Sequence, residues 1–280
     1  MGTSLPETAV SVTASLVNNN ELAVSNVVGS NIFNLMVVVG VCSILTPILV
    51  QKETIKRDIP FSMICAFLLL GLGILAVGDK SGMTLGHLDG MILLGFFAGY
   101  IVAMIQSAMK ARAAGKNVEI EGIEELEEEI GILSWPKSIL FIVGGALAIA
   151  FGGDLTVDAA SRIAIDLGMS QTLVGLTIVS IGTSLPELVT SVVAARKNEV
   201  DMAVGNAVGS NIFNILMVLG IASAINPVAL IRENIIDIVI LIVFSLIVWI
   251  YAATKRKISR KEGISMVCLY LIYAGYIIWR

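Results

Sequence analysis

Charged residues, histidine and cysteine are all scarce in this chain. Only 14% of its 280 residues are charged, 56% are hydrophobic, and the mean hydropathy is +0.91. These values exclude an ordinary soluble domain and place the chain in a bilayer. A single histidine, His87, argues against histidine-based zinc sites and a Ser-His-Asp triad. Cys42, Cys65 and Cys268 lack metal-ligand spacing and are expected to pack among apolar neighbours.

Two further classes of function are excluded by what is missing. The formal net charge is −4, and no basic stripe with interleaved aromatic residues occurs, so nucleic acid is not an expected partner. No serine–lysine, paired-aspartate or histidine–metal signature of an intramembrane enzyme is present either. We therefore expect neither enzymatic activity nor a bound cofactor.

The chain contains an internal duplication. Residues 2–50 and 182–230 align without a gap at a constant offset of 180, and 24 of the 49 aligned positions are identical. The identities gather in two strings, GTSLPE and VGSNIFN. These strings occupy 2–7 and 28–34 in the first copy, and 182–187 and 208–214 in the second.

Long apolar runs predict membrane-spanning helices, since about 20 residues cross a bilayer. We expect helices near 2–17, 23–46, 59–78, 88–109, 137–165, 170–195, 203–226, 234–252 and 263–279. An odd number of helices separates the two copies, so the second copy should enter the membrane in the opposite sense. The predicted fold is an all-α polytopic membrane protein with two inverted-topology five-helix repeats.

The two repeats are predicted at 1–110 and 137–280, joined by an acidic linker at 111–136. The second GTSLPE string follows a complete helix and lies inside another, whereas only Met1 precedes the first string. We therefore expect the first repeat to lack about 45 N-terminal residues, one helix and half of the next, because a spanning helix needs about 20 residues. Ten helices would then make up the complete protein.

Lysine and arginine are unevenly distributed between alternate loops. Of the 18 basic residues, 14 lie on one side, which the positive-inside rule makes cytoplasmic. That side includes the acidic linker, predicted to be a short amphipathic helix, and the C-terminus should lie outside. A regulatory calcium site in the linker is the alternative, but the EF-hand pattern is missing. We expect a multi-pass protein of the cell membrane, in contact with lipid. The sequence leaves the oligomeric state open, and a monomer is taken as the simplest case.

Glu7 and Glu187 place carboxylates at matched positions in two segments that otherwise look membrane-buried. A charge at bilayer depth costs roughly 2.5–3.5 kcal/mol on insertion scales, so such a residue is a functional-site hypothesis by default. The proline before each glutamate should free the carbonyl four residues back, at Gly2 and Gly182. A freed carbonyl at this depth needs a partner, and a bound cation is one.

Further oxygen donors accompany each glutamate in both strings. A cluster of oxygens without thiolate or imidazole suits a hard cation such as Ca²⁺ or Na⁺. The serine and the last asparagine of VGSNIFN are four residues apart and share a helix face. Helix packing is an equal alternative for that string, because small residues and asparagine also join membrane helices. The candidate donors are Thr3, Ser4, Glu7, Ser30, Asn34, Thr183, Ser184, Glu187, Ser210 and Asn214.

The paired strings, their spacing and their duplication resemble the two α-repeats of the cation/calcium antiporter superfamily, most closely the prokaryotic sodium/calcium exchanger type. The resemblance implies a ten-helix fold and implies that the ten donor residues bind the transported ions. It adds the backbone carbonyl of Ser180 as a further ligand. Some sodium/calcium exchangers have aspartate where this chain has Asn214, which leaves ion stoichiometry and proton sensitivity open here.

These observations lead to the hypothesis of a secondary antiporter. It would exchange Ca²⁺ for Na⁺ by alternating access at a midplane site built around two glutamates. Protons could replace sodium at the same glutamates, so a proton/calcium or other cation antiporter is the nearest alternative. A passive cation channel also tolerates acidic pore residues, although inverted repeats around a broken helix favour a transporter.

Overall fold

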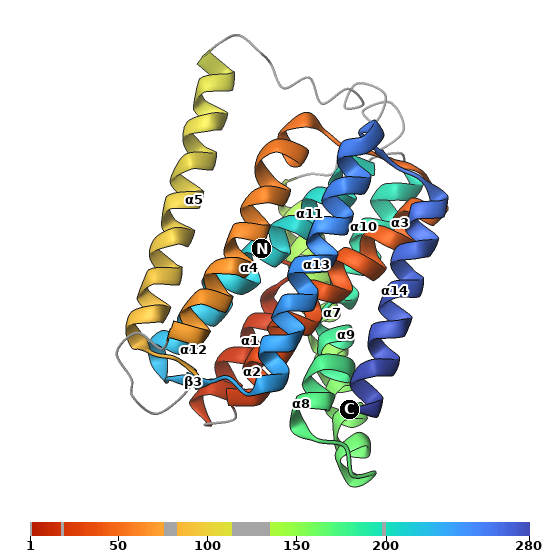
Figure 1. Cartoon of the computed structure of the whole chain (residues 1–280). Coiled ribbons are helices and arrows are strands. Elements are labelled where there is room, and N and C mark those ends of the chain that lie inside the picture. Colours follow the sequence, from red (N-terminus) through yellow and green to blue (C-terminus); the bar gives the residue numbers. More distant parts are fainter. Residues whose placement is uncertain (1, 18–19, 76–82, 114–134, 198–199) are drawn as a thin grey trace.

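A computed structural model shows the chain as a bundle of long helices with a few very short strands (Figure 1). The structure describes residues 2–17, 20–75, 83–113, 135–197 and 200–280. The amphipathic helix predicted in the acidic linker falls at 114–134, outside the described residues.

Each helix predicted from an apolar run has a counterpart, with bounds close to those expected. The first half contains α1 (Leu5–Leu16), α2 (Asn20–Phe33), the π-helical turn η1 (Asn34–Val38), α3 (Val39–Leu45), the π-helical turn η2 (Thr54–Asp58), α4 (Ile59–Leu75) and α5 (His87–Ala113). The second half contains α7 (Trp135–Asp166), α8 (Gln171–Val174), the π-helical turn η3 (Gly175–Val179), α9 (Ser180–Thr183), α10 (Leu185–Arg196), α11 (Val200–Phe213), the π-helical turn η4 (Asn214–Val218), α12 (Leu219–Ile225), α13 (Arg232–Lys255) and α14 (Arg260–Trp279).

Six helical stretches of the described chain are long and apolar enough to cross a membrane. A seventh span results if Gly175–Thr183 and Leu185–Arg196, which meet at an angle of 48°, are counted together. The chain is therefore a multi-span membrane protein. The most buried spans are Leu22–Leu45 and Ala203–Ile225, the segments that carry the two copies of VGSNIFN.

Two small antiparallel sheets join the halves of the chain. Strand β1 (Ile48–Leu49) pairs with β4 (Lys257–Ile258), and β2 (Thr84–Leu85) pairs with β3 (Val228–Ala229). The sheets lie at opposite ends of α13, since that helix begins just after β3 and ends just before β4. Each sheet thus takes one strand from each half of the chain.

The last helix of each half packs against the other half. Helix α14 lies against α3, and its Tyr270 meets Phe33, the last residue of α2, edge to face with ring centroids 5.6 Å apart. Helix α5 lies against α12, and its Phe97 meets Phe213, the last residue of α11, in the same way at 5.7 Å. Edge-to-face pairs add about 0.5–1.5 kcal/mol beyond burial, so the two crossings are stabilised alike.

Glycine permits the close approach at both crossings. A Cβ atom added at Gly90 would lie 2.4 Å from Ala224 N and 2.8 Å from Gly220 O. A Cβ atom added at Gly263 would lie 2.7 Å from Gly40 O. These contacts involve backbone, which cannot turn aside as a flexible side chain can.

The two helices that pack on the opposite half, α5 and α14, start with matching caps. Asp89 Oδ2 accepts a hydrogen bond of 2.8 Å from Gly86 N at the start of α5, and Glu262 Oε2 accepts one of 2.6 Å from Ser259 N at the start of α14. His87, the first residue of α5, lies with Nδ1 2.9 Å from Ala224 O. The single histidine therefore lies at a helix end and contacts a backbone carbonyl of α12.

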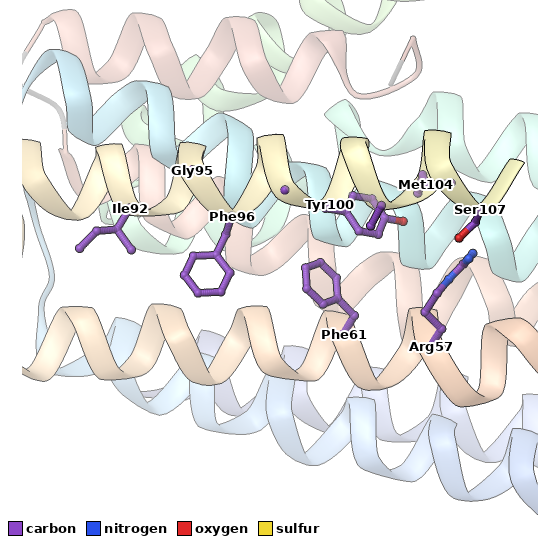
Figure 2. Close-up of a pocket in the computed structure, with 10 residues that line it drawn as sticks. Arg57, Phe61, Ile92, Gly95, Phe96, Tyr100, Met104 and Ser107 are labelled. Atoms are coloured by element: carbon purple, nitrogen blue, oxygen red, sulfur yellow. The ribbon is translucent and has the colours of Figure 1, made fainter. Parts of the chain in front are cut away.

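A hydrophobic core runs through the centre of the bundle, built mainly from α2, α11, α13 and the π-helical turns. Cys42 and Cys65 are buried as expected, but Cys268 is exposed on α14, so the prediction that it packs inside is wrong. A groove of about 630 Å³ lies between α4 and α5, beside the stacked rings of Phe61 and Tyr100 (Figure 2). None of the predicted ion ligands lines this groove.

The glycine crossing can be tested with Gly90→Ala. The added methyl group should force α5 away from α12 and destabilise the protein by about 1–3 kcal/mol, as overpacking does. The measurement is the midpoint of thermal denaturation of the detergent-purified protein. Gly95→Ala on the same helix is the matched control, because a Cβ at Gly95 meets nothing within 4 Å. Equal midpoints for the two variants would contradict the close packing.

Candidate ion-binding site

Each GTSLPE string starts a new helix, and the second string also interrupts one, since α9 ends at Thr183 and α10 begins at Leu185. Ser4 has φ −89° and ψ 15°, and Ser184 has φ −90° and ψ 5°, outside the α-helical region in each case. Each string's proline then falls in the first turn of α1 or α10, where its missing N–H group costs nothing.

The carbonyl groups expected to be free at these breaks are engaged. Gly2 O accepts a hydrogen bond of 3.5 Å from Leu5 N, and Gly182 O accepts one from Ser184 N. The prediction that proline would leave them without a partner is wrong, because the helix restarts at the proline instead of continuing through it. The oxygen donors of the site are therefore mainly side chains.

Glu7 and Glu187 are both completely buried, in the first turns of α1 and α10. The N-terminus of a helix carries a partial positive charge that favours a carboxylate there. The two strings contact each other reciprocally. Ser4 Oγ donates to Glu187 Oε1 at 2.9 Å, and Ser184 Oγ donates to Glu7 Oε1 at 2.9 Å. Reciprocal contacts between residues at one offset are what a two-fold relation between the halves produces.

Ser210 extends this cluster from α11. Its Oγ donates to Glu187 Oε1 at 3.2 Å and lies 3.1 Å from Ser4 Oγ. Three side chains from three different helices thus meet at one carboxylate oxygen. The serine of the second VGSNIFN string is thereby brought to the glutamate of the second GTSLPE string, as the sequence predicted.

Ser30, Thr183 and Ser180 meet on the other side of the site. Ser30 Oγ lies 3.3 Å from Thr183 Oγ1 and donates to the carbonyl of Ser180 at 3.4 Å. The hydroxyl of Ser180 donates to Gly175 O and, at 3.0 Å, to Asn26 O, which fastens α9 to α2. The Ser180 carbonyl therefore lies beside the predicted hydroxyl donors.

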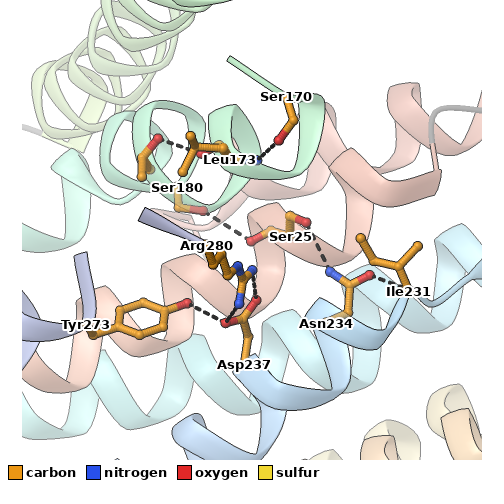
Figure 3. Close-up of polar contacts among 10 residues, drawn as sticks. Ser25, Ser170, Leu173, Ser180, Ile231, Asn234, Asp237, Tyr273 and Arg280 are labelled. Carbon is orange, nitrogen blue, oxygen red and sulfur yellow. Dashed lines mark hydrogen bonds and ion pairs between the residues drawn. The ribbon is translucent and has the colours of Figure 1, made fainter. Parts of the chain in front are cut away.

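A further set of polar contacts supports this region from α13 (Figure 3). Asn234 Nδ2 donates to Ser25 Oγ at 3.1 Å, and Ser25 O in turn accepts from Ser180 Oγ at 3.3 Å. One turn further along α13, Asp237 forms a two-pronged ion pair with Arg280, at 2.9 and 2.8 Å. These contacts hold α2, α9, α13 and the end of α14 in place around the site.

Asn34 and Asn214 begin the π-helical turns η1 and η4. Such turns are rare and occur often at functional sites. Both side chains are completely buried, and each uses its amide nitrogen toward the other half of the chain. Asn34 Nδ2 donates to Asn211 Oδ1 at 3.3 Å, and Asn214 Nδ2 donates to Asn31 Oδ1 at 3.1 Å.

Most buried side-chain oxygens without a hydrogen-bond partner belong to this cluster. Among the described residues, seven buried side-chain polar atoms lack a partner, and two of them, Thr84 Oγ1 and Asp89 Oδ1, lie elsewhere. The remaining five belong to predicted ion ligands: Thr3 Oγ1, Glu7 Oε2, Asn34 Oδ1, Glu187 Oε2 and Asn214 Oδ1. Buried polar atoms without partners are uncommon in proteins, so five in one place call for an explanation.

No basic side chain compensates the two glutamates in the part of the chain that the structure describes. The ion pairs found there are Arg57–Asp58 and Arg280–Asp237, and neither involves Glu7 or Glu187. An uncompensated buried carboxylate is too costly to persist. A cation or a proton is needed at each glutamate.

The sequence prediction missed three asparagines of the site. Asn31 and Asn211 contact Asn214 and Asn34, while Asn26 Oδ1 accepts from Thr183 Oγ1 at 3.2 Å. Each of the three aligns with another asparagine at the offset of 180 residues. This duplication was the signal that could have identified them.

Comparison with known proteins identifies the family to which this chain is similar. A sequence profile described as sodium/calcium exchanger protein matches residues 1–106 and 137–279. The inner membrane protein YrbG of Escherichia coli is 31% identical over 285 residues, covering 100% of this chain and 82% of that protein. The sodium/calcium exchanger MaX1 of Methanosarcina acetivorans is 31% identical over 297 residues, covering 98% and 85%.

Solved structures of a sodium-calcium exchanger share the fold. The exchanger NCX_Mj, soaked with 10 mM Na⁺ and 10 mM Sr²⁺, is 30% identical and superposes with a TM-score of 0.75 over 98% of this chain and 83% of that chain. After soaking with 10 mM Na⁺ and no Ca²⁺ its TM-score is 0.73. With a profile match over most of its length, this chain belongs to the sodium/calcium exchanger protein family.

Proposed function

We propose that the chain is a secondary antiporter that exchanges Ca²⁺ for Na⁺ at a site between Glu7 and Glu187. The observation that carries this proposal is the set of five buried oxygens without partners among the predicted ligands. Two of them belong to Glu7 and Glu187, which form no ion pair with a basic side chain in the described part of the chain. Hard cations prefer oxygen ligands, and Ca²⁺ takes six to eight of them. The ligands are Thr3, Ser4, Glu7, Ser30, Asn34, Thr183, Ser184, Glu187, Ser210 and Asn214, with the carbonyl of Ser180.

Charge balance explains why the two ions would compete for this site. Two carboxylates carry a charge of −2, which one Ca²⁺ or two Na⁺ neutralise. Binding one set of ions therefore excludes the other, and this exclusion is the requirement for exchange. A third Na⁺ would leave a net positive site and make exchange electrogenic. The scheme requires no cofactor, because the ions are the substrates.

Alternating access follows from the relation between the halves of the chain. The site lies where two duplicated segments meet, beside the broken helix Gly175–Arg196, as in transporters built from inverted repeats. Movement of one part against the other would open the site to one side of the membrane at a time. The basic ends of α4 and α13 and the acidic linker would face the cytoplasm, and the C-terminus would face outward.

Glu187→Gln tests the site. The substitution removes one negative charge and should reduce sodium-driven Ca²⁺ uptake into proteoliposomes to background, since a divalent cation would be left uncompensated in a buried site. Glu53→Gln is the matched control: it makes the same change at an exposed position just before η2 and should leave uptake unchanged. Normal uptake by Glu187→Gln would remove this residue from the site.

Transport driven by different ion gradients distinguishes sodium-coupled from proton-coupled Ca²⁺ transport. An outward sodium gradient should drive Ca²⁺ accumulation above its external concentration, and a pH gradient without sodium should not. Accumulation on the pH gradient alone would identify a proton/calcium antiporter instead. Calcium equilibration without accumulation on either gradient would indicate a passive channel.

The reciprocal serines should contribute equally to ion affinity. Ser4→Ala and Ser184→Ala each remove a hydroxyl that contacts a buried carboxylate, an interaction of about 1.5–3 kcal/mol. We expect each to raise the Ca²⁺ concentration for half-maximal uptake by about tenfold or more. Ser245→Ala is the control, because that buried hydroxyl bonds to Leu241 O in its own helix. A ten-fold effect in the control, or none in either site variant, would contradict the arrangement.

A further inference from the structure

We propose that Asn31 and Asn211 are positioning residues that determine which atom of Asn214 and Asn34 faces the transported cation. The proposal rests on the ion site described above and concerns two residues that contribute no ligand of their own. All four asparagine side chains are at most 1% exposed. We refer to Asn31, Asn34, Asn211 and Asn214 together as the amide cluster.

The orientation of Asn211 is set by a group that can only accept. Its Nδ2 donates to the backbone carbonyl of Asn31 at 3.0 Å. A carbonyl oxygen has no proton to donate, so the reversed amide, with Oδ1 against this carbonyl, would place two acceptors together. The Oδ1 atom of Asn211 must therefore point the other way, toward Asn34.

This orientation decides that of Asn34. Because Asn211 presents an acceptor, Asn34 must present its Nδ2 donor to it, at 3.3 Å. The Oδ1 atom of Asn34 is then left without a hydrogen-bond partner and is buried. An oxygen, and not an NH₂ group, is thus kept available for a cation. The orientation of the Asn34 amide is ultimately set by a backbone carbonyl outside the ligand set.

The same chain of two hydrogen bonds, here called the relay, also runs in the opposite direction between the halves. Asn31 Nδ2 donates to the backbone carbonyl of Asn211 at 3.3 Å, and Asn31 Oδ1 accepts from Asn214 Nδ2 at 3.1 Å. Asn214 Oδ1 is left buried and without a partner, as its counterpart is. Each positioning residue supplies the reference carbonyl for the other, so the two ligand amides are oriented through one shared contact between α2 and α11.

Losing the relay should weaken ion binding without removing a ligand. An amide free to reverse would present its NH₂ group to the cation part of the time, which replaces a ligand by a repelling dipole. Substitution of residues that orient metal ligands typically costs 10–100-fold in affinity. We expect a loss in that range for Asn211→Leu, which keeps the approximate volume and removes both polar functions.

The decisive experiment is a double-mutant cycle on Ca²⁺ affinity, measured by equilibrium binding to the purified full chain in detergent. If Asn211 acts through Asn34, Asn211→Leu should change the affinity less than twofold when Asn34→Ala is already present. It should retain its 10–100-fold effect when Asn214→Ala is present. Additive losses with both alanine variants would overturn the proposal, since a general disturbance of the helix contact would affect both backgrounds.

Asn206→Leu is the matched control. Asn206 lies on the same helix and donates to Ser191 Oγ at 3.2 Å and Thr190 Oγ1 at 3.3 Å, but it contacts none of the ligands. This variant should bind Ca²⁺ with unchanged affinity. If Asn211→Leu does not fold, Asn211→Ala and Asn31→Leu replace it, the latter in a cycle with Asn214→Ala. Failure of all three variants to fold would assign the amide cluster to stability and overturn its positioning role.

The outcome is distinguishable from failure of the proposed function. Glu187→Gln is measured in the same binding assay. Loss of Ca²⁺ binding in Glu187→Gln, with normal binding in Asn211→Leu, would leave the ion site standing and reject the positioning role alone. Normal binding in Glu187→Gln would reject the site on which both depend.

Discussion

Two carboxylates buried together, with no basic side chain beside them, are the feature on which this structure depends. Glu7 and Glu187 are completely buried, and the ion pairs found in the described part of the chain lie elsewhere. A protein could not tolerate this arrangement unless the missing positive charge came from outside the chain. A cation or a proton has to supply that charge, and this requirement is the basis of the proposed binding site.

The fold meets this need by bringing two distant segments to one point. Two helices begin directly after Ser4 and Ser184, and each serine donates to the glutamate of the other segment. The halves are then held together because the last helix of each half packs on the other half: α14 packs on α3, and α5 packs on α12. Glycine at both crossings lets the backbones approach closely. Neither half can be separated from the other without dismantling the crossings and the site together.

The helices could be predicted from the sequence, and a set of ligands could be proposed from it, for simple physical reasons. Apolar runs have to match the bilayer thickness, which located the helices to within a few residues. A carboxylate repeated at bilayer depth has few explanations other than function, which identified Glu7 and Glu187. The helical multi-span character of the chain and its family membership are confirmed, while the inverted five-helix repeats and the ion-binding roles remain predictions.

Other features were predicted wrongly or overlooked because the same residue pattern is compatible with more than one local structure. The prediction of free carbonyls at Gly2 and Gly182 was wrong, because proline can begin a helix as well as kink one. The burial expected for Cys268 was also wrong, since an apolar residue of a membrane helix can face lipid as easily as protein. Asn31 and Asn211 were overlooked because asparagine also serves as a helix contact in membranes.

The most direct test of the central claim is the position of the transported ion itself. Crystals grown with Ca²⁺ would be measured at a wavelength where calcium scatters anomalously. The account predicts an anomalous peak between Glu7 and Glu187, about 2.3–2.6 Å from carboxylate oxygens of both residues. A calcium peak located elsewhere, with the two carboxylates hydrogen-bonded to each other or to protein groups alone, would contradict the proposed site.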